Sequence, residues 1–326
     1  MRILITGAGG AAAITVWKSL SAEHELHMAD MDPLAAGLYL VPPDQRLIIP
    51  RGDAPELVPA LHGACTERGI AALLPTVDAE LGPVAGARDR FESDGIALPI
   101  SPVECLRVCR DKQLLIEAVQ GKVPVPGNEP LTEAVAARID AFPRFAKPRE
   151  GAGSRGVAKI NSRADLDRQP KDGSVMLQEY LPGEEYSVDV YVRRDGRAIA
   201  AVPRDRMKID SGIAVASRTV NLPDVIQSAI RTAEIIGIRG IANVQFKRGA
   251  DGVFKLLEVN PRFPGTLPLT VAAGIDMPKL MVDELMGRPV PDKLMPFKEL
   301  MVVRYWTEQY FDPREWEVLC RQRSVG

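Results

Sequence analysis

The chain has 326 residues, with 41 basic and 43 acidic side chains and a formal net charge of −2 at pH 7. This length is enough for two or three domains with sizeable cores. A nearly balanced charge gives no electrostatic basis for binding nucleic acid or an anionic membrane, so we expect small-molecule partners.

The start of the chain, MRILITGAGG, has neither the charged region nor the small-residue cleavage site of a signal peptide, and no apolar run approaches about 18 residues. We therefore expect a cytoplasmic protein without a membrane span. The four cysteines form no CxxC pair, so reduced thiols are expected. His24, His27 and His62 are the only histidines, which excludes a histidine-based hydrolase in the C-terminal two thirds.

Short apolar runs alternate with helical stretches in the first part of the chain. The sequence predicts a strand over 2–5, a helix around 14–20, strands over 25–30 and 46–50, a helix over 54–67, a strand over 71–75 and a fifth strand over 94–101. Strands that alternate with helices form a parallel sheet covered on both faces. The expected fold class of residues 1–105 is α/β, a doubly wound Rossmann-like domain.

A glycine pattern follows the first predicted strand. Gly7, Gly9 and Ala12, with Asp30 about twenty residues on, fit the fingerprint of a dinucleotide-binding turn. A tight turn between a strand and a helix also favours glycine without any dinucleotide. Such a turn can instead hold a carboxylate or phosphate at the helix N-terminus.

The second part of the chain has a different pattern. Residues 102–120 are amphipathic at helical spacing and predict one connecting helix, followed by a proline-rich turn over 122–130. The predicted strands are then 143–147, 157–160, 174–180, 186–193, 197–203, 213–220, 241–248 and 253–259, with a helix over 223–236. Hairpin-like turns such as RRDGRA and RGADGV favour an antiparallel α+β architecture.

The stretch AKPREGAGSRGV places Lys147 at the end of a strand, just before a loop with three glycines. The order GxxxxGK[ST] of a P-loop is missing. A lysine followed by a glycine loop suits a lid, in which the lysine pairs with nucleotide phosphates and backbone N–H groups of 151–156 close over them. A hairpin with an exposed lysine is the alternative.

Two further stretches carry polar residues at informative spacing. In VMLQEYLPGEEYSVDVYV, backbone groups of 179–181 could bind an adenine edge and Glu185 could accept the ribose hydroxyls, although a charged hairpin turn fits as well. In LEVNPR, Glu258 and Asn260 share one strand face, with Arg262 just beyond and Gln245 on the neighbouring strand. Oxygen donors on one face suit Mg²⁺ shared with a polyphosphate.

Taken in order, Lys147 with GAGSRGV, then QEYLPGEEYSVDV, NVQF and LEVNPR resemble the ATP-grasp superfamily. The chain most resembles one synthetase-domain half of the carbamoyl-phosphate synthetase large subunit and the ligase of pyrrolysine biosynthesis. The resemblance covers essentially the whole chain, because ILITGAGG and LLPTVDAELGPVA also look like the N-terminal domain of that family. It implies a Rossmann-like domain at 1–105, a small lobe with a glycine lid at 106–185 and a C-terminal lobe with the metal site at 186–326.

The resemblance also implies roles for individual residues. The ATP-binding residues that it implies are Lys112, Lys147, Gly151, Gly153, Ser154, Gly156, Gln178, Glu179, Tyr180, Leu181 and Glu185. The ligands of two Mg²⁺ ions, with Mn²⁺ as an alternative, are Gln245, Glu258 and Asn260. The catalytic residues are Arg262, Lys147, Arg206 and Lys208, the last two in a mobile basic segment that also contains Arg204.

The function that the resemblance implies is an ADP-forming carboxylate–amine ligase, which makes an amide or peptide bond through an acyl phosphate and acts on an amino acid or another small acid. The acceptor pocket is expected near Gly9, Gly10 and 76–80, and a homodimer is compatible with the family. The sequence NPRFPGT departs from the serine-rich continuation of the carbamoyl-phosphate enzymes. An NAD(P)-dependent oxidoreductase and an ATP-binding sensor without turnover are the alternatives.

Overall fold

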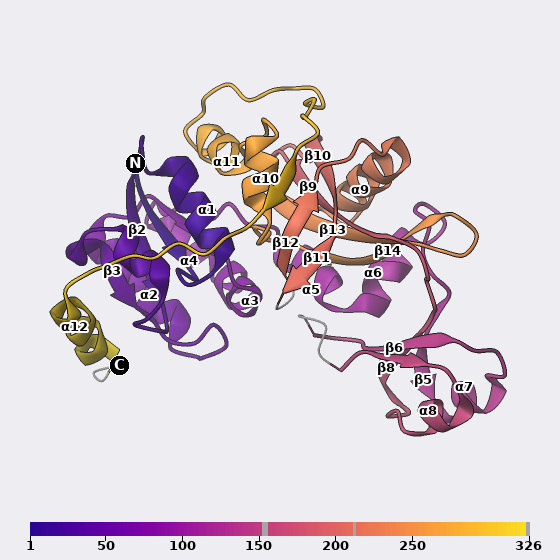
Figure 1. Ribbon diagram of the computed structural model, residues 1–326. Helices are drawn as coiled ribbons and strands as arrows, with labels where there is room; N and C mark the ends of the chain where they lie inside the picture. The colour runs from indigo at the N-terminus through magenta and orange to yellow at the C-terminus, as the bar shows by residue number, and fades with distance from the viewer. Residues whose placement is uncertain (152–155, 211–212, 324–326) are drawn as a thin grey trace.

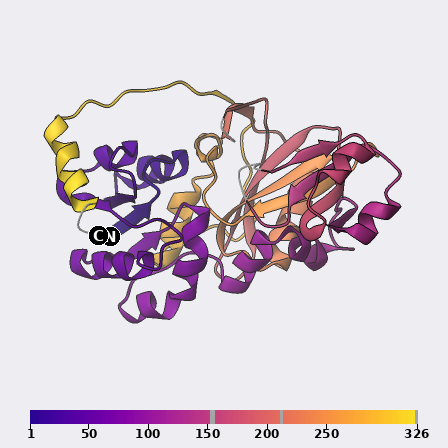
Figure 2. The same cartoon turned by 90° about the horizontal axis from the view of Figure 1, so that it is seen from below.

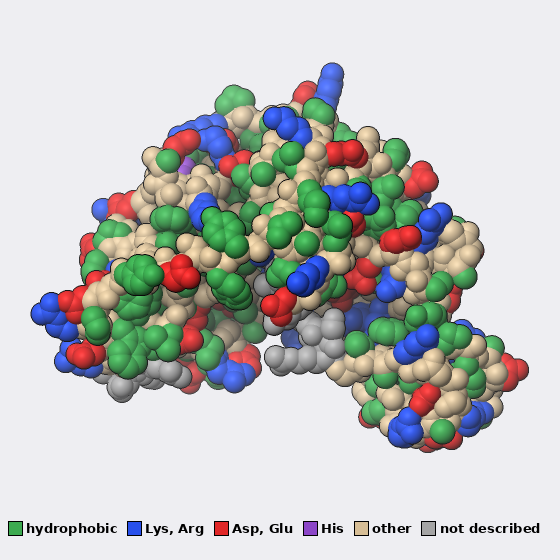
Figure 3. All heavy atoms as spheres, viewed as in Figure 1, with side chains coloured by type: hydrophobic (Ala, Val, Ile, Leu, Met, Phe, Trp, Pro, Cys, Tyr) green, Lys and Arg blue, Asp and Glu red, His purple; other side chains and the backbone are tan. Residues whose placement is uncertain are grey.

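The computed structural model describes residues 1–151, 156–210 and 213–323. These residues form four β-sheets, three of them large enough to organise a unit of the molecule and one small (Figure 1). On the face seen in Figure 3, the unit that carries β5 to β8 stands apart from the rest of the molecule. No helix in these ranges combines the length and apolar character needed to cross a membrane.

The N-terminal sheet is parallel, in the order β3-β2-β1-β4. Its strands are β1 (Arg2–Thr6), β2 (Glu25–Asp30), β3 (Arg46–Ile48) and β4 (Ala72–Leu74). Its helices are α1 (Ala11–Leu20), α2 (Leu57–Arg68), α3 (Asp78–Gly86) and α4 (Arg88–Ser93), with short 3-10 turns η1 (Ala36–Leu40) and η2 (Pro43–Gln45). Ile3 and Ile5 belong to one core and Leu4 to another, because successive side chains of a strand point to opposite faces.

Two predictions for this part of the chain are wrong. Residues 94–101 form no strand, and only Ala97 bridges to Ala72 in β4. The predicted helix over 102–120 is broken into α5 (Val103–Arg110) and α6 (Lys112–Val119). Asp111 between them has an extended backbone, and its carboxylate accepts the N–H groups of Gln113 and Leu114 at the start of α6. A side chain that caps a helix in this way favours a new N-terminus.

The small lobe has an antiparallel sheet in the order β5-β8-β6-β7. Its elements are β5 (Asn128–Thr132), α7 (Glu133–Arg138), β6 (Arg144–Pro148), β7 (Ala158–Ile160), α8 (Arg163–Asp167) and β8 (Asp172–Glu179). Strand β5, which begins inside the stretch expected to be a turn, pairs with β8. The glycine loop lies between β6 and β7.

The C-terminal lobe is built on the antiparallel sheet β10-β9-β13-β14. Its elements are β9 (Glu185–Val192), β10 (Ala198–Asp205), α9 (Pro223–Ile235), β13 (Gly240–Arg248), β14 (Phe254–Asn260), α10 (Leu267–Ala272) and α11 (Met277–Leu285). A small sheet in the order β11-β12-β15 contains β11 (Lys208–Asp210), β12 (Ile213–Arg218) and β15 (Met301–Val303). The residue boundaries of the three predicted units stay predictions.

The last described segment returns to the N-terminal domain. After β15 an extended stretch crosses the molecule to α12 (Pro313–Arg323), which packs beside β3 (Figures 1 and 2). Arg46 in β3 makes an ion pair with Glu315 in α12, with Nη1 2.6 Å from Oε2. The last described helix is therefore held against the N-terminal domain.

Candidate active site

A cavity of about 130 Å³ lies between the small-lobe sheet and the C-terminal sheet. We call it the lysine cavity, because two lysines contribute to its wall. Its lining residues are Lys112, Phe145, Lys147, Pro148, Gly151, Val157, Gln178, Glu185, Gln245, Leu257 and Glu258. The structure thus brings together both lysines, the base of the glycine loop and four of the other polar side chains that the sequence singled out, Gln178, Glu185, Gln245 and Glu258.

Both lysines are buried at the cavity wall. The Nζ of Lys147 donates to the carbonyl of Leu257 at 3.2 Å, and that of Lys112 donates to the carbonyl of Gly151 at 2.9 Å. Burial lowers the pKa of Lys147 to about 8, with the Glu258 charge raising it and the Lys112 charge lowering it further. Burial also lowers the pKa of Lys112, against nearby carboxylates. Two buried ammonium groups beside a cavity favour an anion there.

The oxygen donors lie on two paired strands. Gln245 in β13 is directly opposite Glu258 in β14, and Asn243 is opposite Asn260. The Nδ2 of Asn260 donates to Glu258 Oε1 at 3.2 Å, so these two side chains share one face. Within the described ranges no three His, Cys, Asp or Glu side chains cluster as a metal site. One carboxylate and two amides suit Mg²⁺ only if phosphate oxygens supply further ligands.

Two further polar side chains of the lysine cavity, Gln178 and Glu185, differ in their interaction partners. Gln178 is 2% exposed, and its Oε1 has no hydrogen-bond partner among the described residues. Because a buried amide oxygen without a partner is unfavourable, Gln178 is available to a ligand in the cavity. Glu185 lies 3.5 Å from Arg206 Nε and 3.7 Å from Lys247 Nζ.

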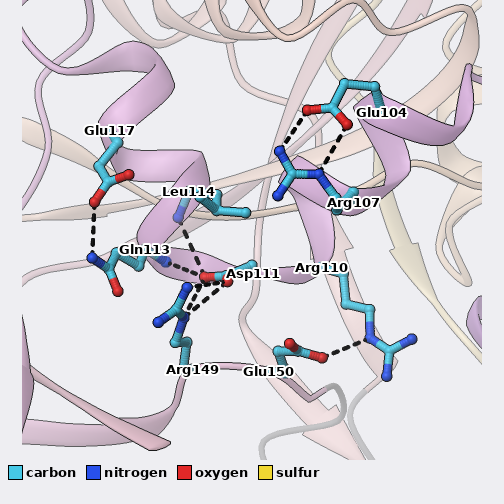
Figure 4. Close-up of polar contacts among 9 residues, drawn as sticks. All are labelled: Glu104, Arg107, Arg110, Asp111, Gln113, Leu114, Glu117, Arg149 and Glu150. Atoms are coloured by element: carbon cyan, nitrogen blue, oxygen red, sulfur yellow. Dashed lines mark hydrogen bonds and ion pairs between the residues drawn. The ribbon is translucent and has the colours of Figure 1, made fainter. Parts of the chain in front are cut away.

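The base of the glycine loop is fixed to the break between α5 and α6 (Figure 4). Arg149 donates from Nε and Nη2 to the carboxylate of Asp111, with Nη2 2.6 Å from Oδ2. The backbone N–H of Lys112 donates to the carbonyl of Arg149 at 3.1 Å, and Arg110 pairs with Glu150 at 2.9 Å. These contacts hold residues 149–151 beside Lys112.

A second cavity, of about 350 Å³, lies between the N-terminal domain and the C-terminal lobe. We call it the interdomain cavity. Its lining residues are Gly7, Gly9, Gly10, Ala11, Ala12, Asp30, Thr76, Val77, Ser187, Arg204, Arg206, Ala214, Asn243, Gln245, Asn260, Arg262, Pro264, Gly265 and Thr266. Gln245 lines both cavities, so they adjoin at that side chain.

The N-terminal wall of this cavity is shaped by close packing. Gly7 has φ +67°, and a Cβ there would lie 2.6 Å from Thr76 Oγ1, so this turn requires glycine. The Gly9 N–H donates to Asp30 Oδ2 at 2.8 Å. Glu80 accepts the N–H groups of Thr76 and Val77 at 3.0 and 2.8 Å. Burial raises the pKa of Glu80, and these hydrogen bonds oppose the rise.

Three arginines of the C-terminal lobe, Arg204, Arg206 and Arg262, line this cavity. Arg262 Nε lies 2.7 Å from Oδ1 of Asp78, the first residue of α3, and the pair joins the two domains. Arg204 is 2% exposed and donates to Asp189, which is fully buried and also accepts from Asn243 and Thr270. Arg204 was expected in a mobile segment. It lies instead in β10, in a buried ion pair.

Family comparisons match both parts of the chain. Residues 171–309 match the model described as "ATP-grasp in the biosynthetic pathway with Ter operon", and residues 3–99 match the PylC-like N-terminal domain. In both parts the chain is similar to ATP-grasp proteins. The expected fold class, a Rossmann-like domain followed by a two-lobed ATP-grasp domain, is confirmed.

Comparisons with individual relatives agree with the matches to the family models. The vancomycin B-type resistance protein VanB of Enterococcus faecalis is 25% identical over 259 residues, which cover 68% of this chain and 70% of that protein. The carbamoyl phosphate synthase large chain of Xylella fastidiosa is 25% identical over 232 residues, 62% of this chain but 21% of that protein. This chain therefore matches about a fifth of the synthase.

Solved structures share the fold. The biotin carboxylase domain dimer of 2-oxoglutarate carboxylase from Hydrogenobacter thermophilus, in complex with MgADP, ADP and bicarbonate, has a TM-score of 0.73 at 17% identity. The match covers 91% of this chain and 72% of that one. At this identity the likeness concerns the ATP-grasp fold alone.

Some predicted residues of the ATP-grasp site lie outside the two cavities or have other partners. Glu179 binds Lys255 Nζ at 2.7 Å, and its N–H donates to the Gly127 carbonyl. Tyr180 lies under Lys159, with Nζ 4.2 Å from the ring centroid. The remaining cases are Leu181, which is buried, Gly156, which has φ +70°, and Lys208, which is exposed in β11. Gly153 and Ser154 lie outside the described residues.

Sequence reasoning assigned no role to three acidic residues, although one of them, Asp78, lies in the segment 76–80 expected at the acceptor pocket. Asp111 stands directly before Lys112, Asp78 opens α3, and Asp189 interrupts an apolar strand. Only Asp189 left a clear signal, because a lone acid among alternating apolar residues of a buried strand needs a partner. The partners of Asp111 and Asp78 lie far along the chain, at Arg149 and Arg262.

Proposed function

We propose that the protein is an ATP-dependent, ADP-forming carboxylate–amine ligase, which joins its substrates through an acyl phosphate. The observation that carries this proposal is the pair of adjoining cavities, one with two buried lysines and the other with Arg262, that meet at Gln245. The first suits a nucleotide triphosphate and the second a small carboxylate. The comparisons support the ATP-grasp ligase family and leave the substrates open.

In this proposal Lys147 and Lys112 bind the phosphates of ATP. Both ammonium groups already lie at a cavity wall and donate only to backbone carbonyls in the hydrogen bonds above, so their positive charge is available to phosphate oxygens. Phosphate binding favours the charged form of Lys147 and opposes the effect of burial on its pKa. Glu185 and Gln178 would bind the nucleoside from the same cavity.

Gln245, Glu258 and Asn260 would hold two Mg²⁺ ions, or Mn²⁺ in their place. Their oxygens fit because they lie on paired strands at the border of the two cavities. When bound, the metal would neutralise charge on the phosphate oxygens. Arg262 then stabilises charge on the phosphoryl group as it moves to the substrate carboxylate.

The acceptor carboxylate would occupy the interdomain cavity. The first N–H groups of α1 face it, and Gly10 caps α1 without a side chain, so the helix N-terminus is open to an anion. An amine then attacks the acyl phosphate and yields the amide and phosphate. Arg206 lines the same cavity, whereas Lys208 would take part only through movement of its segment.

The dinucleotide hypothesis is less well supported. Asp30, which would bind the ribose of a dinucleotide, accepts hydrogen bonds from Gly9 and Asp32 N–H groups. The positive φ of Gly7 and its close packing against Thr76 and Val77 explain this glycine without a dinucleotide. The hypothesis also gives no role to Lys147 or Glu258.

We further propose a cytoplasmic homodimer.

Product analysis tests the proposed function. Purified protein, ATP, Mg²⁺ and pooled amino acids would be incubated with hydroxylamine, which traps an acyl phosphate as a hydroxamate. The expected products are ADP, phosphate and a hydroxamate. AMP with pyrophosphate would contradict acyl-phosphate chemistry. Tight ATP binding without turnover across the whole pool would instead favour the ATP-binding sensor.

A further inference from the structure

A third cavity, of about 460 Å³, lies between the N-terminal domain and the C-terminal lobe. We call it the arginine cavity, because Arg88, Arg194 and Arg239 line it. None of its described lining residues belongs to the lysine cavity or to the interdomain cavity. Small-molecule sites have volumes of about 300–1,000 Å³ and occur preferentially between domains, so this cavity has the size and the place of a binding site.

The walls of the arginine cavity come from two domains. Helix α4 and the segment 95–102 form the N-terminal wall, and the end of β9, the start of β13 and helix α11 form the C-terminal wall (Figure 1). The walls touch at Gly240, because a Cβ there would lie 3.2 Å from the carbonyl oxygen of Pro99. Ser101 also joins them, since its Oγ accepts the N–H of Arg239 at 3.0 Å. A ligand between these walls would therefore contact both domains.

The two acids of this cavity already have partners in the protein. Glu92 pairs with Arg88, whose Nη1 lies 2.9 Å from Oε1. Arg88 also donates to two backbone carbonyls of the N-terminal wall, each at 2.8 Å. Glu284 accepts the hydroxyl of Tyr191 at 3.0 Å and the backbone N–H of Arg194 at 2.9 Å. Both carboxylates and the first of the three arginines are therefore engaged within the walls.

The other two arginines make no ion pair with an acid of the described ranges. The Arg239 guanidinium donates to one backbone carbonyl, at 2.8 Å. Arg194 differs from its neighbours in the turn after β9, because Arg193 and Arg197 each lie 3.5 Å from Asp195. A guanidinium group without a carboxylate partner can form paired hydrogen bonds with a carboxylate or a phosphate. These two arginines therefore favour an anionic ligand.

Apolar side chains form much of the remaining wall. Ile96 and Leu98 lie on the N-terminal side, and Met281 and Leu285 lie on the C-terminal side. Small-molecule sites combine such a wall with a few polar groups that fix the orientation of the ligand. The two arginines and this wall together fit a small anion that has an apolar part.

We propose that the arginine cavity is a second ligand site, which binds a small organic anion. The ligand is a carboxylate or a phosphate joined to an apolar group. Arg194 and Arg239 bind its anionic group, and the apolar wall contacts the rest of it. The inference does not depend on the ligase reaction, because the residues of this cavity are separate from those of the other two.

Calorimetric titration with phenyl phosphate and with benzoate tests the proposal. Benzyl alcohol and benzylamine serve as the neutral and the cationic match of these probes. The variants are Arg194→Gln and Arg239→Gln, with Arg197→Gln as the matched control, because Arg197 belongs to the same turn but does not line the cavity. Lys147→Ala is added, since phenyl phosphate could also bind in the lysine cavity. Circular dichroism checks the fold of each variant.

The expected result is that at least one of the two anions binds, and that benzyl alcohol and benzylamine bind at least about tenfold more weakly. Arg194→Gln and Arg239→Gln should each weaken binding of the anion about tenfold or more, which is the effect of losing a hydrogen bond between charged groups. Arg197→Gln and Lys147→Ala should bind it as wild type does. If Arg239→Gln does not fold, Arg194→Gln decides, because its side chain is exposed.

Three outcomes would overturn the proposal. The first is that neither anion binds with a Kd below about 1 mM. The second is wild-type affinity in Arg194→Gln, or a loss of binding in Lys147→Ala, which would assign the probe to another site. The third is equal affinity for benzyl alcohol and the anions, which would mean that the arginines do not select the charge of the ligand.

Discussion

Replacement of Asp111 tests how the glycine loop is held. The Asp111 carboxylate has two separable tasks. It caps α6 by accepting the N–H groups of Gln113 and Leu114, at 2.9 and 3.3 Å, and it binds the guanidinium of Arg149 through three contacts of 2.6 to 2.9 Å. Asp111→Ala removes both tasks, whereas Asp111→Asn keeps the cap and removes the charge.

The expected loss in the free energy of unfolding has two parts, from the helix cap and from the ion pair with Arg149. Loss of a capping side chain costs about 1 kcal/mol. The ion pair adds about 1 kcal/mol and no more, because the Arg149 side chain is 35% exposed and solvent screens it. We therefore expect Asp111→Ala to lower the free energy of unfolding by about 2 kcal/mol and Asp111→Asn by about 1 kcal/mol. Urea denaturation followed by tryptophan fluorescence measures both.

The pH dependence gives an independent check. Burial acts to raise the pKa of Asp111, but the hydrogen bonds from Arg149 and from the N–H groups of Leu114 and Gln113 outweigh it and lower the pKa below 3.8. A lowered pKa stabilises the folded state at pH values above the pKa of Asp111 in the unfolded chain. This stabilisation is lost as the pH falls through the pKa of Asp111 in the folded protein. Wild type should therefore lose more stability than Asp111→Asn as the pH falls below about 4.

Asp111→Ala should also weaken ATP binding. Residues 149–151 lie beside Lys112, whose Nζ donates to the Gly151 carbonyl. A released loop base should raise the KM for ATP several-fold in Asp111→Ala and less in Asp111→Asn. Equal stability of the two variants, or an unchanged KM for ATP in Asp111→Ala, would refute this reasoning.

Three further predictions concern residues at the two cavities. Glu258→Ala should abolish ATP turnover and leave circular dichroism unchanged, because it removes the only carboxylate among the predicted Mg²⁺ ligands; activity near wild type would contradict the metal site. Arg204→Leu should lower the free energy of unfolding by about 3 kcal/mol or more, because it leaves the fully buried Asp189 charge without its cation, and the double variant with Asp189→Asn should recover part of this loss in urea denaturation. Asp78→Asn should lower kcat but change stability by less than about 1 kcal/mol, since the Asp78 and Arg262 side chains are 37% and 24% exposed; an unchanged kcat would mean that Asp78 does not position Arg262.

The strands of the site were predictable because their pattern is local. Alternation places Glu258 and Asn260 on one face, and the structure has them in contact. The apolar strand before Lys147 likewise ends at the cavity. The order of the motifs, rather than any single one, indicated the superfamily.

The predictions that failed concern residues whose partners lie far away in the sequence. Residues 102–120 have the spacing of one helix, yet Asp111 interrupts it by capping α6, and the same carboxylate binds Arg149, well along the chain. Residues 94–101 have the composition of a strand but make one bridge only. Arg204 looks like part of an exposed basic segment until Asp189 on the paired strand is considered. Local pattern carries no information on such contacts.

One strand end connects the two cavities. Glu258 lines the lysine cavity, whereas Asn260 and Arg262, which follow on the same chain segment, line the interdomain cavity. A phosphoryl group that leaves ATP beside the lysines for a carboxylate in the interdomain cavity must pass this segment and Gln245. Arg262 is held there by Asp78 of the N-terminal domain. The residue proposed to stabilise the transferred group is thus anchored by the domain that is proposed to bind the acceptor. In this proposal the position of that domain would determine whether Arg262 is aligned for transfer.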